Sequence, residues 1–163
     1  MSPEHKRFLL LEQGIGAAVF NLALNAAIAW LLFRQFSEVP LWGQLSIAGD
    51  TFGTCFFLPF FTALIVTPLV RRRMRRGGLA AVELDGPLGA LTRSLPRRTL
   101  SCALALGVAC ALVIGPVAVW TCDRLSIAPL QLWPFVTLKA VFAATLAAVM
   151  TPLISLRALA SAR

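Results

Sequence analysis

The chain has 163 residues, of which 58% are apolar and only 13% are charged, and its mean hydropathy is +0.80. Soluble domains usually contain about 45–50% apolar and about 25% charged residues, so this composition argues against a water-soluble fold. The net charge is +8, from 15 Lys and Arg against 7 Asp and Glu. Taken alone, that charge would indicate an acidic partner such as a nucleic acid.

Four apolar stretches determine the fold class. Each has about 20 residues, the length that a helix needs to cross about 30 Å of hydrocarbon, and a helix satisfies its own backbone hydrogen bonds there. We therefore predict an all-α integral membrane protein, a single four-helix domain over residues 1–163. The predicted spans are 14–33, 51–70, 99–120 and 135–155.

The first span has an alternative interpretation as a cleaved signal peptide. His5, Lys6 and Arg7 form a basic start, and residues 27–29 read Ala-Ile-Ala, which resembles a cleavage site. However, Glu12 interrupts the apolar stretch, and the stretch that follows exceeds the roughly 7–15 residues of a signal core. We expect an uncleaved helix.

The basic residues are distributed asymmetrically between the predicted loops. Twelve lie in the two termini and in the loop 71–98, two lie in the other loops, and Lys139 lies inside the fourth span. Because short loops rich in Lys and Arg stay cytoplasmic, both termini and loop 71–98 are predicted inside. The tryptophans fall on the predicted outer side, where the indole favours the interface; they are Trp30, Trp42, Trp120 and Trp133.

Five arginines in the segment 71–76 follow directly on the second span. They are Arg71, Arg72, Arg73, Arg75 and Arg76. No aromatic residue is interleaved with them, and attraction to anionic lipid supplies about 1 kcal/mol per basic residue near the surface. We expect contact with the inner leaflet of a bacterial inner membrane and no nucleic-acid partner; specific lipid recognition is a further possibility.

The rest of loop 71–98 contains four leucines at helical spacing. A short interfacial helix could begin with Asp85 as its cap and Pro87 in its first turn. A loop that touches the membrane explains the same residues, and both interpretations stay open. The leucines are Leu84, Leu88, Leu91 and Leu95.

Two short motifs recur and indicate an internal duplication. Leu-Ser-Ile-Ala occupies residues 45–48 and 125–128, while Val-Thr-Pro-Leu at 66–69 resembles Met-Thr-Pro-Leu at 150–153. The chain would then consist of two duplicated hairpins related by an axis along the membrane normal. Chance recurrence in a sequence of low complexity is the alternative.

Lys139 is the one Lys or Arg inside a predicted span, about four residues from its outer end. Asp50 begins the second span at a similar depth, so an ion pair across the bundle is predicted. Its functional interpretation is a polar vestibule for an anionic or proton-coupled substrate. In the structural alternative Lys139 extends to the outer headgroups and Asp50 caps its helix.

Asn21 and Asn25 are four residues apart and therefore share one face of the first span. Asparagine within a membrane usually hydrogen-bonds to a neighbouring helix, which predicts a packing or oligomerisation face. A pore or substrate face is the alternative.

The residues needed for enzymatic chemistry are scarce. The single histidine is His5 in the N-terminal segment, the four cysteines form no CxxC motif, and the acidic residues form no pair at one depth. We expect no enzyme, no cofactor and no metal site. Small multidrug-resistance exporters also have four short spans, but they rely on a glutamate in the first helix, where this chain has Asn21 and Asn25.

The functional expectation is a small inner-membrane protein that acts through helix–helix contacts as an accessory or assembly factor. Its partners would be the lipid bilayer and either a second copy or another membrane protein. The alternative is a small oligomeric transporter or channel that uses Lys139, Asp50, Asn21 and Asn25.

Overall fold

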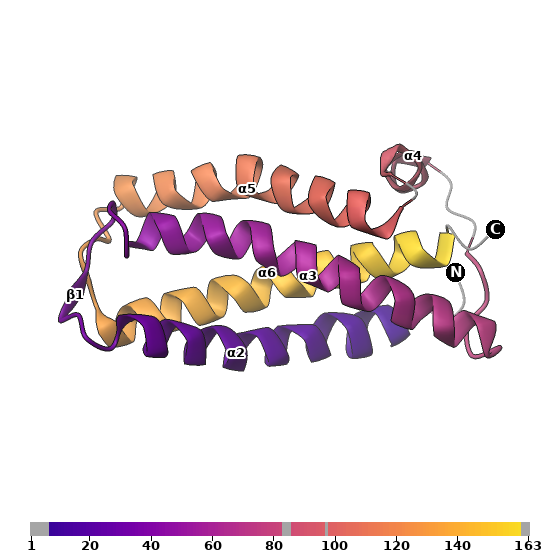
Figure 1. Ribbon diagram of the computed structural model, residues 1–163, viewed down its shortest axis with the longest axis horizontal. Coiled ribbons are helices and arrows are strands. Elements are labelled where there is room, and N and C mark those ends of the chain that lie inside the picture. The colour runs from indigo at the N-terminus through magenta and orange to yellow at the C-terminus, as the bar shows by residue number, and fades with distance from the viewer. Residues whose placement is uncertain (1–6, 83–85, 97, 161–163) are drawn as a thin grey trace.

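The computed structural model describes residues 7–82, 86–96 and 98–160. It is a bundle of four long helices that run alternately in opposite directions in chain order (Figure 1), which confirms the predicted all-α membrane fold. The first helix comprises the π-helical segment η1 (Phe8–Ile15) and α2 (Gly16–Phe33). The others are α3 (Ile47–Arg75), α5 (Thr99–Arg124) and α6 (Leu132–Ala160).

The helices extend beyond the predicted spans because polar and charged residues that flank an apolar stretch can continue the same helix. α3 and α6 have 29 residues each, and η1 with α2 has 26, as does α5. At 1.5 Å per residue these lengths reach about 40 Å, which includes the headgroup regions. In α3 the extension runs through residues 71–75, since arginine is a good helix former.

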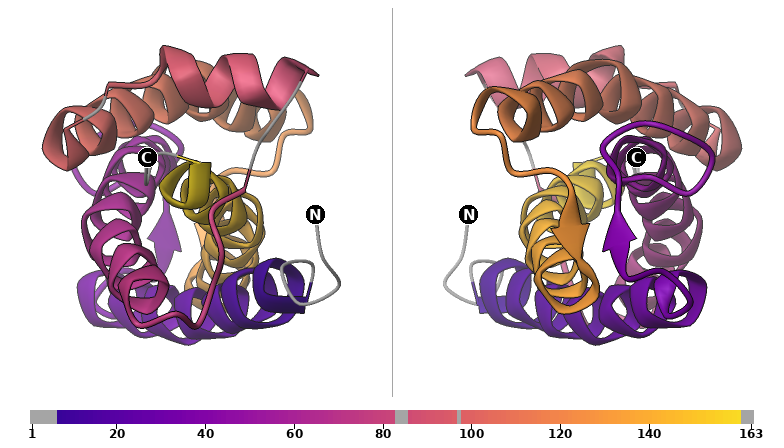
Figure 2. Two further views of the ribbon diagram at one scale, coloured as in Figure 1. Left: turned by 90° about the vertical axis from the view of Figure 1, so that its right-hand side faces the viewer. Right: turned by 90° about the vertical axis from the view of Figure 1, so that its left-hand side faces the viewer.

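The two helices within each hairpin, α2 with α3 and α5 with α6, do not pack closely together. α3 and α6 lie side by side at the centre, α2 packs on α6, and α5 packs on α3. α2 and α5 occupy opposite sides of this central pair (Figure 2). Exchanging α2 with α5 and α3 with α6 leaves this pattern of packed pairs unchanged.

A two-stranded ribbon joins the two interhelical loops at the end of the bundle that carries the tryptophans, here named the tryptophan end. β1 (Glu38–Val39) pairs antiparallel with β2 (Leu130–Gln131), with Val39 opposite Leu130. Val39 is fully buried and packs with Phe33 and Phe135 in an apolar cluster beneath the ribbon. The ribbon therefore ties the two hairpins together.

The opposite end carries the arginines of segment 71–76 and is here named the arginine end. The short helix α4 (Gly86–Ser94) lies at this end, on the side of the bundle where α5 begins (Figure 1), so the helical interpretation of the loop is confirmed. Leu84 and Asp85 lie outside the described residues, as do the side chains of Leu88 and Leu91. The predicted cap and apolar face therefore stay predictions.

The two recurring motifs have different structural outcomes. Residues 66–69 and 150–153 occupy similar positions in α3 and α6, and Thr67 and Thr151 are both buried. Residues 45–48, however, enter α3 with Ser46 as N-cap, whereas residues 125–128 follow the end of α5, and Ser126 has φ +49°. The Leu-Ser-Ile-Ala motif is thus not structurally equivalent between the hairpins.

Candidate functional site

A long groove opens between α2 and α3, because these two helices do not pack along their length. Its volume is about 710 Å³, and α6 contributes Lys139 and Thr151 to its floor. The lining extends from Glu12 and Gln13 near the arginine end to Gln44 and Ser46 near the tryptophan end. The groove therefore extends along most of the length of the bundle.

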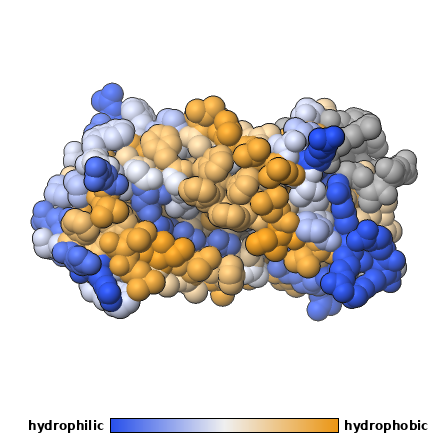
Figure 3. Space-filling view, viewed as in Figure 1, coloured by the Kyte–Doolittle hydropathy of each residue, from blue (hydrophilic) through white to orange (hydrophobic). Residues whose placement is uncertain are grey.

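Exposed apolar side chains form the two walls of the groove. On α2 they recur every four residues, at Phe20, Leu24, Ile28 and Leu32; on α3 they are Phe57, Phe61 and Ile65. Hydrophilic residues lie deeper between these walls, and Figure 3 shows them at the bottom of a hollow flanked by hydrophobic atoms. The groove thus has apolar walls and a partly polar floor.

An ion pair between Lys139 of α6 and Asp50 of α3 lies on this floor. The two side chains are only 5% and 10% exposed, so the predicted contact across the bundle forms inside the protein. Lys139 does not extend to the headgroups, and Asp50 is not the helix cap. Both parts of the structural alternative are therefore wrong for this structure.

The loop before α3 fixes the depth of Asp50. Ser46 is the N-cap: its hydroxyl accepts from the Gly49 N–H at 3.1 Å and donates to the Gly43 carbonyl at 2.9 Å. The amides of Ile47 and Ala48 donate to loop carbonyls at 3.0 Å. With its first amides satisfied, α3 can begin within the membrane-facing part of the bundle and hold Asp50 in its first turn.

A second cavity lies on the other side of the ion pair. It has a volume of about 240 Å³ between α5 and α6, and α3 contributes Ile47 and Thr51 to its lining. Asp50 and Lys139 line this cavity as well as the groove. The ion pair is therefore the polar partition between two separate spaces.

Asn21 and Asn25 both line the groove. Their side-chain amides donate to carbonyls of their own helix, Asn21 to Ala17 at 2.9 Å and Asn25 to Asn21 at 3.0 Å. Within the described residues neither amide donates to another helix of this chain, and the packing or oligomerisation face stays a prediction. The groove itself keeps α3 away from this face of α2.

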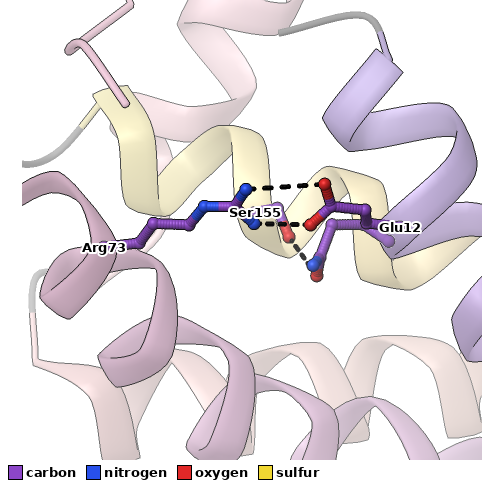
Figure 4. A network of polar contacts seen from close by, with 4 residues as sticks. Glu12, Arg73 and Ser155 are labelled. Atoms are coloured by element: carbon purple, nitrogen blue, oxygen red, sulfur yellow. Dashed lines mark hydrogen bonds and ion pairs between the residues drawn. The ribbon is translucent and has the colours of Figure 1, made fainter. Parts of the chain in front are cut away.

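A second ion pair bridges the groove at the arginine end. Arg73 of α3 contacts both carboxylate oxygens of Glu12 in η1 (Figure 4). Both side chains are about half exposed, and the Arg73 guanidinium also lies 4.9 Å from the centre of the Phe8 ring. Beside this pair, the Ser155 hydroxyl donates to the side-chain amide oxygen Oε1 of Gln13 at 3.0 Å and links α6 to η1.

The structure buries two polar groups that the sequence did not indicate as site residues. Arg157 of α6 is 3% exposed and donates to the Pro96 carbonyl. Thr151, on the groove floor, has a buried hydroxyl with no hydrogen-bond partner in the described structure. Arg157 lies just beyond the fourth predicted span, where an arginine normally signals orientation and not burial, so its sequence position carried no signal of a site.

Cysteines and metal-binding residues do not form a second candidate site in the described part of the chain. Cys55, Cys102 and Cys110 are buried, Cys122 is partly buried, and all four are free. Among the described residues there is no group of three or more potential metal ligands. The groove and its ion pair are thus the best-defined candidate site.

Comparisons with known proteins add no functional assignment. No protein-family model matches the chain, and no curated protein or solved structure matches it. The four-span fold and the geometry of the groove are therefore the evidence on which a functional proposal rests.

Proposed function

We propose that this protein is a non-enzymatic accessory or assembly factor that binds a transmembrane helix of another membrane protein in the groove between α2 and α3. The groove carries the proposal: it extends through most of the bundle and has apolar walls and a partly polar floor. A transmembrane helix has the length and the apolar surface that such a groove would accommodate.

The forces that associate helices in lipid match the groove. Lipid tails are as apolar as a helix surface, so close packing and interhelical polar contacts drive association. The side chains of Phe57, Phe61 and Ile65 offer packing surface, and Asn21, which is partly exposed in the lining, offers a polar contact. Each interhelical hydrogen bond would contribute about 1 kcal/mol or less.

A second copy of this chain fits the groove less well. A two-fold dimer places the same surface patch on both subunits, so two concave grooves would face each other and leave their volume unfilled. A convex helix from a different protein fills the groove directly. We therefore propose a heterologous partner and treat self-association as an outcome of the test.

Gly53 provides the means to test the proposal. It lines the groove, and a Cβ built on it meets no atom within 4 Å. Gly53→Trp should fill the groove and abolish recovery of the partner, while the matched control Gly53→Ala should retain it. The measurement is quantitative mass spectrometry of proteins that co-purify from native membranes.

Site-specific photo-crosslinking identifies what occupies the groove. A photoreactive residue replaces Phe61 in the groove or, as control, Leu112, which is 71% exposed on α5. We expect Phe61 adducts to map to an apolar segment of another protein and Leu112 adducts to differ. Adducts to a second copy would contradict the proposed partner, and adducts to lipid alone would contradict the proposed function.

The ion pair supports a second candidate function, a small transporter or channel. Asp50 and Lys139 separate two cavities, and a partition of opposite charges can open when one partner meets a substrate. In this reading Asp50→Asn with Lys139→Met abolishes flux in reconstituted vesicles and leaves partner recovery intact. Loss of partner recovery in Gly53→Trp alone supports the accessory role.

The proposed setting is a bacterial inner membrane with both termini in the cytoplasm. Its support is the concentration of arginines at one end of the bundle and of tryptophans at the other. In this orientation the arginines of segment 71–76 would contact anionic headgroups of the inner leaflet. Accessibility of single introduced cysteines to a membrane-impermeant reagent on each side tests the orientation.

A further inference from the structure

A buried cation at the arginine end has no counterion in the described structure. Arg157 is 3% exposed, and its guanidinium donates to the Pro96 carbonyl, while its Nε has no hydrogen-bond partner. Within the described residues, the ion pairs join other side chains, Arg73 with Glu12 and Lys139 with Asp50. A buried charge is costly unless an opposite charge and hydrogen bonds satisfy it.

The Arg157 guanidinium lies beside the N-terminus of α5. Pro96, which accepts its hydrogen bond, precedes the first residue of α5 by three positions. Arg98 is the N-cap, and no side chain of the described residues caps the helix there. The first turn, from Thr99 to Cys102, contains no acidic residue. The amides of Thr99, Leu100 and Ser101, which precede the first helical hydrogen bond from Cys102 to Arg98, therefore present partial positive charge.

A third helix contributes to the same place. Arg71 of α3 donates to the Thr99 hydroxyl at 3.5 Å. Two guanidinium groups from two helices thus meet the positive end of a third.

We infer that this junction binds a phosphate group, with Arg157 as its cation and the first-turn amides of α5 as donors. A phosphate oxygen can accept from a guanidinium and from helix N-terminal amides together. The site lies at the arginine end of the bundle, where α5 begins. Its phosphate can belong to a phospholipid headgroup or to a free phosphate, and the experiment separates these sources.

The binding assay uses the purified full chain in three conditions. They are nanodiscs of phosphatidylcholine, nanodiscs that also contain phosphatidylglycerol, and detergent micelles with inorganic phosphate against chloride at equal ionic strength. Salt at about 0.5 M screens exposed charges, because the Debye length is then well below 10 Å. A rise in thermal stability with phosphatidylglycerol alone identifies a lipid headgroup, and a rise with inorganic phosphate in detergent identifies a free phosphate. No rise in any condition overturns the proposal.

Substitution of Arg157 tests which arginine matters. At this salt concentration Arg157→Gln should weaken binding of the stabilising ligand at least tenfold. The matched control Arg72→Gln removes an exposed arginine one position from Arg71 and should change binding less than about twofold, since its charge is screened. Equal effects of the two substitutions contradict a site and indicate general attraction to the arginine end.

A second pair of variants, at Thr99, tests the same site if Arg157→Gln does not fold. Thr99→Asp places a carboxylate in the first turn of α5, beside Arg71, and should replace the ligand: the variant is stable without phosphate, and phosphate stabilises it no further. Thr99→Asn has a similar shape without the charge and should keep the phosphate dependence. If both variants respond like the natural sequence, the proposal is wrong.

One other source of negative charge is the chain itself. Glu83 and Asp85 lie outside the described residues. The double variant Glu83→Gln with Asp85→Asn should retain the phosphate response. Loss of stability to the same extent as in Arg157→Gln, with no phosphate response in the natural sequence, would show that a carboxylate of the chain is the counterion and would overturn the proposal.

Discussion

The two long sides of α3 differ in how closely another helix approaches. Toward α5 the helices are in tight contact: a Cβ added at Gly107 would lie 2.9 Å from the Phe56 carbonyl oxygen, and one at Gly115 would lie 2.6 Å from the Phe52 ring. Toward α2 there is no such packing, and a Cβ added at Gly53 would meet no atom within 4 Å. One helix thus has a closed side and an open side.

The difference between the two sides shows which residues allow two helices to pack closely in this bundle. On the closed side, glycine lets an aromatic ring and a backbone carbonyl approach, as small residues do at membrane helix contacts. On the open side, α2 presents larger side chains, such as Phe20 and Leu24, which flank the groove without reaching α3. The open side depends on polar contacts: one buried ion pair to α6 and one exposed ion pair to η1.

The largest expected effect comes from breaking the buried ion pair on the floor of the open side. Lys139→Met leaves the Asp50 carboxylate buried and uncompensated, which should reduce the free energy of unfolding by about 3–5 kcal/mol. The measurement is thermal or denaturant unfolding of the purified chain in a fixed detergent.

A double variant separates charge from packing. Asp50→Asn with Lys139→Met removes both charges and should recover most of the loss, because a buried pair replaced as a unit costs little. If the double variant is as unstable as Lys139→Met alone, the side chains act independently and the pair does not explain the effect.

The closed side should respond strongly to a single added methyl group. In Gly107→Ala the new Cβ would overlap the Phe56 carbonyl oxygen at 2.9 Å and the Phe56 ring at 3.1 Å. Overpacking of this kind costs about 1–3 kcal/mol, so α5 should shift away from α3 and the unfolding temperature should fall. An unchanged stability would show that the contact is looser than the structure indicates.

The same substitution on the open side should have the opposite sign. Gly53→Ala adds a methyl group in open space within a helix. Alanine is favoured over glycine in helices by about 0.5–1 kcal/mol, so this variant should be slightly more stable than the natural chain. Measured beside Gly107→Ala, it tests the contrast between the two sides directly; a loss of stability would mean that the groove is occupied or closed at this point.

The sequence predicted the fold well because membrane spans depend on local properties. About 20 apolar residues must form a helix in lipid wherever they occur, so the four spans were correct to within a few turns. The contact between Lys139 and Asp50 was also predictable, because two opposite charges at the same depth have few other partners.

The groove was not predictable, because it depends on which helices pack together. The sequence places α2 and α3 in one hairpin, and helices joined by a short loop usually pack as neighbours; here α2 packs on α6 instead. Asn21 and Asn25 therefore line an opening and bond to their own helix. The burial of Arg157 was missed for a related reason, since it results from the meeting of α6 with the start of α5.

The structure adds a repeated feature that bears on the duplication, which stays a prediction. The guanidinium of Arg34 lies 5.3 Å from the ring centre of Trp30, and that of Arg124 lies 5.6 Å from that of Trp120. Each pair ends the first helix of its hairpin, and helix lengths of 26 and 29 residues recur in the same order. These equivalences favour two related hairpins over chance recurrence of short motifs.

The smallest expected effect concerns the exposed ion pair at the arginine end of the open side. Arg73→Gln removes the contact with Glu12, but both side chains are about half exposed, so water replaces much of it. Exposed pairs contribute about 0.2–1 kcal/mol, and the loss should shrink as salt is added. Unfolding measured at low and at high salt tests this. If Arg73→Gln reduced the free energy of unfolding as much as Lys139→Met does, this ion pair would be a main contact between α3 and the first helix. The groove would then be held closed at its arginine end by an ion pair.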